Sequence, residues 1–219
     1  MSKLHYVSIG NKCQTAKALN KLKYRQFALP FDFVSTLPHL IAKYIDNPKN
    51  FYPSLGQIRN SDGCFFGHFF KTNFTQTEYN ETIHLFERRF KRLNELFNNP
   101  NNDIVLIYAD LASVFNELEA RTIDHVDSLN QLKTFLTNKF TKTNFKFLCY
   151  HPSKELCKYN NSTISHFNLN IPKECYLKRN LFGGRNRQKS YTPKVFKKIL
   201  QEKLESTING KKETKKKNT

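Results

Sequence analysis

Apolar positions along the chain follow two spacings, short continuous runs and stripes of helical period. The continuous runs predict buried strands at Leu4–Ile9, Ile104–Tyr108, Phe145–Tyr150 and Ser165–Ile171. The stripes predict helices at Cys13–Lys23, from Thr36-Leu37-Pro38 to about Asp46, at Thr77–Asn98, at Val126–Phe140 and after Thr192-Pro193. We expect Thr36 to cap the second of these helices, with its proline in the first turn.

Strand, helix and strand follow one another between Ile104 and Tyr150, which is typical of a right-handed parallel crossover. We find no internal repeat and no linker before the tail. The sequence therefore predicts a single α/β domain over residues 1–206, with a mostly parallel central sheet flanked by helices. Two shorter runs, Gln57–Arg59 and Cys64–Phe70, are predicted as strands joined by a turn at Ser61-Asp62-Gly63.

Charge is distributed unevenly along the 219 residues, which carry a formal net charge of +18. From Arg185 onward, twelve Lys or Arg face three Glu. The stretch Lys211–Lys217 has no apolar residue, so we predict a disordered basic tail over residues 207–219. Such a tail either keeps the chain in solution or binds weakly to nucleic acid or another acidic surface, and it also resembles a nuclear-import signal.

Several classes of protein are excluded by what the sequence lacks. No apolar run reaches about 18 residues and the N-terminus has no secretory signal, so we expect no membrane partner and an intracellular, cytoplasmic location. The five cysteines include no Cys-x-x-Cys pair, so we expect reduced thiols, no metal site and no cofactor.

Cys13 is the leading candidate for chemistry. It follows Gly10 by three residues, at the point where a predicted strand turns into a predicted helix. Free backbone N–H groups and the positive end of the helix dipole both favour a thiolate there. The N–H groups around Asn11 to Gln14 are candidates for an oxyanion hole. Cys64 is a weaker candidate, because a thiol within an apolar strand has a raised pKa.

A cysteine nucleophile needs a base and a group that orients the base. His68, at the end of the aromatic run Cys64–Phe70, is the preferred base, with His151 as the rival and His166 as a weaker third. We expect Cys64–Phe70 to lie beside the first strand and so to bring His68 near Cys13. Asp110 ends a predicted strand and is the first choice of orienting carboxylate.

Asp32 is the second choice of carboxylate, and the alternative roles for it are to cap a turn or to pair with Arg25. On helix Thr77–Asn98, the arginines are expected to lie largely off the apolar stripe; they include Arg88, Arg89 and Arg92. Arg25 and Arg89 are candidates for substrate binding, facing an acidic substrate, and the alternative is that these arginines only support Asp32 and Glu87.

The residues Ser8–Cys13, followed by Ala16 and Leu19, then Arg25 and Pro30–Phe33, resemble the N-terminal signature of the putative papain-like cysteine peptidases, a family of bacteria and large DNA viruses. That signature reads Ser-Leu-Gly-x-x-Cys and Pro-Phe-Asp-Trp, and Ile9 and Phe33 replace its Leu and Trp here. The resemblance covers residues 4–110 and implies a cysteine peptidase. It also implies, as an alternative fold, a papain-like α+β domain.

Two functions follow. In the first, Cys13 attacks the carbonyl of a peptide, isopeptide or amide, and a histidine removes the thiol proton and later protonates the leaving group. In the second, the chain is a basic nucleic-acid-binding or scaffold protein in which Cys13 only starts a helix. A viral origin, which the resemblance allows, would extend the location to a host cytoplasm or nucleus, or to a virion.

Overall fold

The computed structural model describes residues 2–10, 13–109, 125–151, 160–168, 197–198, 200–202 and 204–205. The chain divides into two compact units, Met1–Asn168 and Leu169–Thr219. In the second unit the described residues are helical, which agrees with the helix predicted after Thr192-Pro193. The tail predicted over 207–219 lies outside the described residues. All further description concerns the first unit.

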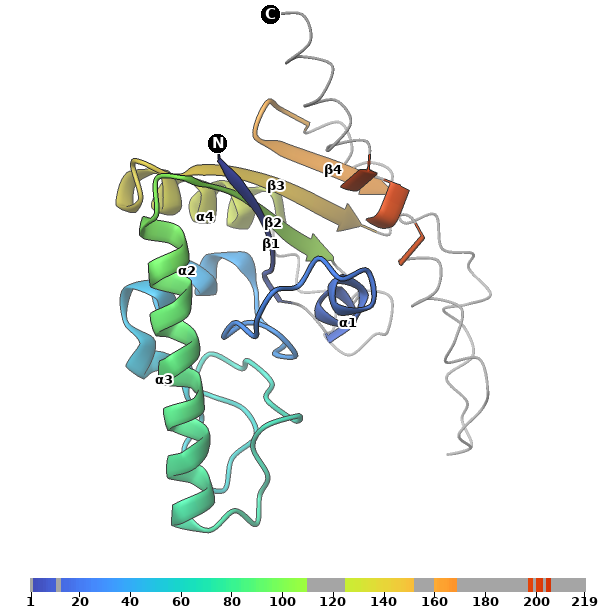
Figure 1. Cartoon of the computed structure of the whole chain (residues 1–219). Helices are drawn as coiled ribbons and strands as arrows, with labels where there is room; N and C mark the ends of the chain where they lie inside the picture. The colour runs from blue at the N-terminus through green and yellow to red at the C-terminus, as the bar shows by residue number, and fades with distance from the viewer. Residues whose placement is uncertain are drawn as a thin grey trace, which may run out of the picture. The chain divides into compact units, whose positions relative to one another are not determined.

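The first unit is built on a four-stranded sheet in the order β1-β2-β3-β4, in which every neighbouring pair is parallel (Figure 1). The strands are β1 Lys3–Ser8, β2 Asn102–Ala109, β3 Asn144–His151 and β4 Ile164–Asn168. The predicted α/β fold with a parallel central sheet is thus confirmed, and the papain-like α+β alternative does not describe this unit. In this register Ser8 lies opposite Ile107, which lies opposite Leu148.

Among the described residues, five helical segments accompany the sheet: α1 Cys13–Lys21, α2 Pro38–Asp46, the short 3-10 helix η1 Pro48–Phe51, α3 Gln76–Asn98 and α4 His125–Lys139. The four predicted α-helices in this unit are present within two residues of their expected bounds. No helix among the described residues is long and apolar enough to cross a membrane.

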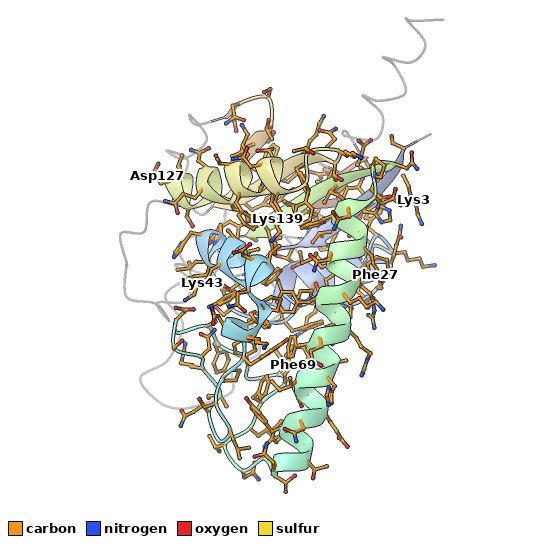
Figure 2. All side chains as sticks on the ribbon, turned by 90° about the vertical axis from the view of Figure 1, so that its left-hand side faces the viewer. Lys3, Phe27, Lys43, Phe69, Asp127 and Lys139 are labelled. Carbon is orange, nitrogen blue, oxygen red and sulfur yellow. The ribbon has the colours of Figure 1, made fainter. Side chains whose placement is uncertain are left out.

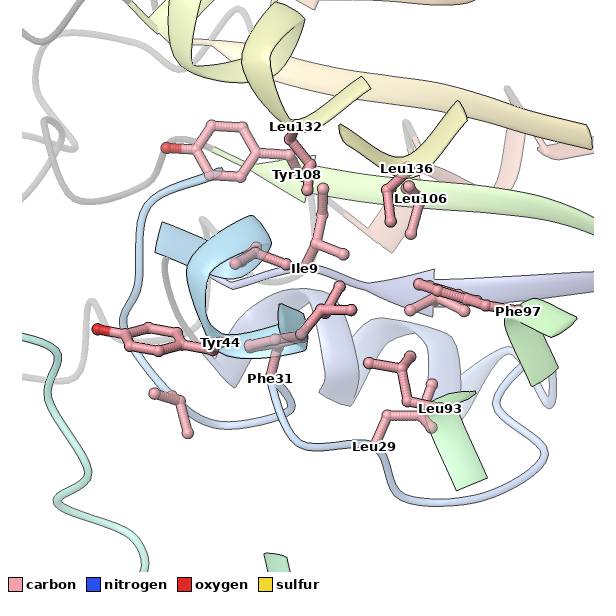
Figure 3. Packing of buried hydrophobic residues seen from close by; sticks show 14 of the residues in the cluster. Ile9, Leu29, Phe31, Tyr44, Leu93, Phe97, Leu106, Tyr108, Leu132 and Leu136 are labelled. Carbon is pink, nitrogen blue, oxygen red and sulfur yellow. The ribbon is translucent and has the colours of Figure 1, made fainter. Parts of the chain in front are cut away.

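Helices α2, α3 and α4 cover one face of the sheet. Val7, Leu106 and Phe147 from three adjacent strands share one buried cluster with residues of these helices. Figure 3 shows part of this core, with Leu106 on the sheet side and Tyr44 and Leu93 on the helix side. The strands in the middle of the sheet are therefore buried on both faces, as their continuous apolar runs predict.

Helix α1 and Tyr24, which comes shortly after it, belong to the opposite face. Successive residues of a strand point to opposite faces, so Tyr6 points away from the cluster that holds Val7. The Tyr6 ring lies 5.1 Å from the ring of Tyr24, which follows α1. Ala16 and Leu19 on α1 are buried.

Helix α3 begins with a complete capping box, in which Thr75 and Glu78 satisfy each other's backbone N–H groups. Its inner stripe packs against the aromatic segment that precedes it. Phe69 in that segment lies beside α3 (Figure 2), with its ring 4.9 Å from the ring of Phe86. This packing holds the segment of residues 57–70, which the sheet does not include, against the domain.

Two predicted strands are wrong. Gln57–Arg59 and Cys64–Phe70 form only isolated bridges, Ser35 with Phe65 and Arg59 with Phe65. The carbonyl of Phe66 accepts hydrogen bonds from the N–H groups of Phe69 and Phe70, so the chain turns there and cannot extend. The predicted placement of this run beside β1 is wrong as well, because β2 is the strand that pairs with β1.

Two smaller expectations also fail. The N-cap of α2 is Leu37, with no side-chain hydrogen bond, and the Thr36 hydroxyl instead lies 3.2 Å from the Cys64 sulfur. Arg89 is not on the solvent side of α3 but is buried, with 8% of its surface exposed. Aromatic rings on the 57–70 segment cover it, and the periodicity of α3 alone carries no sign of that cover.

Candidate functional site

Cys13 is the first residue of α1 and is partly buried. The chain leaves β1 at Ser8, hydrogen-bonds once more to β2 through Ile9, and turns at Gly10, whose φ is +94°. A parallel sheet of this type binds ligands at the carboxyl ends of its strands, which is the edge where this turn lies. The structure therefore places Cys13 where its sequence position predicted, at a strand-to-helix turn.

Gly10 is required at this turn for two reasons. Its positive φ is one that residues with a Cβ rarely adopt. A Cβ at this position would also lie 2.6 Å from Cγ2 and 3.2 Å from the carbonyl oxygen of Thr36. The turn that leads into Cys13 is thus held directly against the segment that precedes α2.

The same segment leads to His68. Ser35, next to Thr36, makes two backbone hydrogen bonds with Phe65, at 3.0 and 3.1 Å. Phe33 lies edge-on to His68, with their ring centroids 5.7 Å apart. His68 itself is exposed. Residues 33–36 therefore contact both the chain near His68 and the turn before Cys13. The predicted strand pairing did not include these contacts.

Asp32 is the centre of a charged cluster. It is buried, and its Oδ2 accepts hydrogen bonds from Nε of Arg25 at 2.9 Å and from the Leu29 N–H at 2.9 Å, with Nη2 of Arg25 at 2.8 Å. Burial raises the pKa of Asp32, while Arg25 and these hydrogen bonds act to lower it. The pairing with Arg25, an alternative already open from the sequence, is present. The Arg25 guanidinium also lies 5.5 Å from the centre of the Phe33 ring.

Arg89 joins this cluster from α3. Its guanidinium carbon lies 4.7 Å from the centre of the Phe69 ring and 5.2 Å from that of Phe86. Burial lowers the pKa of Arg89 to about 10, against the opposing influence of Asp32. The structure thus brings three predicted site residues, Arg25, Asp32 and Arg89, into one cluster. A fourth, His68, lies next to this cluster, because its ring packs on Phe33, which Arg25 also contacts.

Sequence reasoning missed buried hydroxyl groups on β1 and α1, the two elements that flank the Gly10 turn. Ser8 ends β1 and Thr15 lies in the first turn of α1, and neither hydroxyl has a hydrogen-bond partner. The Tyr6 hydroxyl, on the same strand, also lacks one. Buried polar groups without partners are uncommon, and they are available to a ligand. The sequence signal for Ser8 was its place between the apolar residues Val7 and Ile9, and Thr15 has no such signal.

Cys64 is held by a different network. Its sulfur lies 3.2 Å from the Tyr44 hydroxyl and 3.2 Å from the Thr36 hydroxyl. The Tyr44 hydroxyl in turn donates a hydrogen bond to Asp62, at 2.9 Å. Burial raises the pKa of the Cys64 thiol, as expected of a cysteine in an apolar setting. This arrangement stabilises an uncharged thiol and does not favour a nucleophile.

The remaining candidates are only partly described. Asn11 and Asp110 lie outside the described residues, as do Cys157 and Cys175. Gln14 is the second residue of α1, and His151 is the last residue of β3, at the same sheet edge as the turn before Cys13. His166 is in β4. Over the described part of the chain, no three His, Cys, Asp or Glu side chains gather as metal ligands would.

The fold and these residues define an open parallel α/β domain with a cysteine at the carboxyl edge of its first strand. A family model described as "Putative papain-like cysteine peptidase" matches residues 4–55. The matched segment includes β1, Cys13, the Arg25–Asp32 pair and α2, so the predicted resemblance is confirmed there. Searches among curated proteins and among solved structures found no match.

Proposed function

We propose that this protein is a cysteine peptidase or a related thiol-dependent hydrolase, with Cys13 as its nucleophile. The observation that carries the proposal is the position of Cys13, at the first residue of α1 and at the carboxyl edge of a parallel sheet. The family match over residues 4–55 supports the general peptidase assignment and includes this position.

In the proposed reaction the Cys13 thiolate attacks the carbonyl carbon of a peptide, isopeptide or side-chain amide. The tetrahedral oxyanion accepts hydrogen bonds from N–H groups around Asn11 to Gln14, since the first N–H groups of a helix have no intrahelical partner. The leaving amine takes the proton that the base removed from the thiol. Water then hydrolyses the thioester and regenerates the thiol.

The proposed base is His68, supported by the contacts that tie residues 33–36 both to the Gly10 turn and to the His68 segment. His151 stays the alternative because it ends β3 at the edge where β1 also ends. For the orienting carboxylate we propose Asp110, the residue after the end of β2. Asp32 is less suited to that role, since its Oδ2 already binds Arg25 and the Leu29 N–H.

The proposal is tested by acyl transfer from p-nitrophenyl acetate. We expect a burst of p-nitrophenol and a hydroxylamine-sensitive acetyl group that peptide mapping assigns to Cys13. Cys13→Ala should lose the burst, whereas Cys64→Ser, the matched control at a buried thiol, should keep it. Acetylation that is equally fast in Cys13→Ala would contradict the proposal. Between His68→Ala and His151→Ala, the variant with the larger loss of burst rate identifies the base.

A further inference from the structure

The guanidinium of Arg89 is buried without an acceptor. Its Nε–H and the N–H groups of Nη1 have no hydrogen-bond partner, although 8% of the residue is exposed. Arginine keeps its charge when buried, and its N–H groups in such a setting normally meet a carboxylate or a carbonyl oxygen. The Phe69 and Phe86 rings stabilise the charge through their faces but accept no in-plane hydrogen bond.

The neighbouring acids are already engaged. Asp32 gives its Oδ2 to Arg25 and to the Leu29 N–H. Glu87, two residues before Arg89 on α3, lies 2.9 Å from Nδ1 of His84. None of the ion pairs among the described residues joins Arg89 to a carboxylate, although the charge of the nearby Asp32 acts to raise the pKa of Arg89.

Further arginines add positive charge around it. Arg88 and Arg92 lie on the adjacent positions of α3, and Arg92 donates a hydrogen bond to the Ala28 carbonyl oxygen at 3.1 Å. Arg25 faces the same Asp32 carboxylate. Arg25 and Arg89 thus share one carboxylate, that of Asp32, and Arg92 adds a further charge one turn along α3, which leaves a surplus of positive charge at this place.

We propose that Arg89 anchors a binding site for an oxyanion, a carboxylate or a phosphate group of a ligand. The planar fork of a guanidinium binds two oxygens of either group, and a partly desolvated fork packed against two aromatic rings is preorganised for it. Arg25 and Arg92 supply additional charge at the rim. This site is independent of the chemistry at Cys13, although an acidic substrate of the proposed hydrolase is one ligand that would use it.

The test follows the Nε–H resonances of arginine in the full-length protein by NMR, during titration with inorganic phosphate and, separately, with acetate at constant ionic strength. We expect the Arg89 resonance to shift in a saturable manner. Tighter binding of phosphate would indicate a ligand with a phosphate group, and tighter binding of acetate a ligand with a carboxylate. Arg89→Lys keeps the charge but loses the fork, and its binding is followed through the Nε–H resonance of Arg25. This variant should bind about tenfold more weakly or worse. Arg88→Lys, the matched control at an exposed neighbour, should change it less than about twofold.

A shift that rises linearly and equally with chloride would overturn the proposal, as would unchanged affinity in Arg89→Lys. If that variant does not fold, the wild-type titration decides, because the Arg89 Nε–H reports on the site directly. Cys13→Ala should bind the anion as the wild type does. An inert Cys13 would thus contradict the proposed hydrolase and leave this site untouched.

Discussion

Asp32 is a buried carboxylate of the matched segment that binds both a guanidinium and a backbone N–H group. Its pair with Arg25 joins side chains that are 3% and 18% exposed. Removing one partner of a buried ion pair leaves the other charge without compensation. Asp32→Asn should therefore lower the free energy of unfolding by about 3 kcal/mol, measured by urea denaturation at pH 7.

Asp46→Asn is the matched control for this change. Asp46 pairs with Lys139 at 2.8 Å, but its side chain is 68% exposed. An exposed pair contributes less than about 1 kcal/mol. Equal losses in the two variants would mean that Asp32 does not stabilise the fold through a buried pair.

Asp62 offers a test of pH dependence at the same scale. Burial acts to raise its pKa, but hydrogen bonds from Lys43 and Tyr44 outweigh burial and lower it. A lowered pKa in the folded state gives stability that is present above the ordinary carboxyl pKa of about 4 and is lost as the pH falls through the folded value. Asp62→Asn should thus be destabilised relative to the wild type at pH 7, by up to about 1 kcal/mol.

The difference between the wild type and Asp62→Asn should disappear near pH 2, since Asp62 is then uncharged in both states. Urea denaturation at both pH values measures it. A difference that persists unchanged at low pH would rule out the charge of Asp62 as its cause.

The surroundings of a residue could be predicted from the sequence where they are formed by residues close to it along the chain. Cys13 at a helix start and Asp32 beside Arg25 are consequences of short separations along the chain. Arg89 was misplaced because its cover, Phe69, belongs to a segment 20 residues away. The buried Ser8 hydroxyl was missed because a single polar residue in an apolar run is usually taken as a tolerated exception, and Thr15 was missed because its neighbours Gln14 and Lys17 are polar.

At the level of elements, the turn between β1 and α1 depends on Gly10. Gly10→Ala should be destabilised by about 2 kcal/mol or more, because alanine is strained at positive φ and its Cβ would meet Thr36. Gly63→Ala is a matched control: φ is +81° there, but nothing lies within 4 Å of the added Cβ. It should lose only about 1 kcal/mol in urea denaturation.

Equal destabilisation of the two glycine variants would mean that Thr36 adapts and that the Gly10 turn is not tightly packed. If the account is right, Gly10→Ala should also slow alkylation of Cys13, since the turn sets the start of α1. Gly63→Ala should leave that rate unchanged.

Among the elements, long periodic segments were predictable and the aromatic segment was not. Helix α3 and strand β2 follow clear periodicities, and their positions were expected within one or two residues. Cys64–Phe70 has the composition of a strand, yet its rings pack against α3 and its backbone turns at Phe66. Tertiary packing overrode local propensity there.

For the whole molecule, the parallel sheet followed from the strand-helix-strand order, because parallel neighbours require a crossover. The pairing of β1 with β2 could not be predicted from this order. Because 93 residues separate Ser8 from Asn102, the sequence allowed several strands as the neighbour of β1. The expected single domain of residues 1–206 stays a prediction alongside the two compact units.

The charge of the C-terminus leads to a prediction at this scale. Residues 208–219 contain five Lys and one Glu, and we propose that they bind nucleic acid weakly. Deleting them should leave the thermal midpoint within about 1 °C, because they bring almost no apolar surface to bury. Binding to a DNA duplex, measured by fluorescence anisotropy, should weaken and lose part of its salt dependence. Unchanged binding would place any nucleic-acid surface elsewhere in the chain.

The central claim is that Cys13 is the reactive nucleophile of a thiol-dependent hydrolase. Limited labelling of the folded protein with iodoacetamide near pH 7, followed by peptide mapping of all five cysteines, tests it most directly. We predict that Cys13 is alkylated first and that Cys64 and Cys149, which are buried, are alkylated only on unfolding. Preferential labelling of any other cysteine, with Cys13 unmodified, would contradict the account.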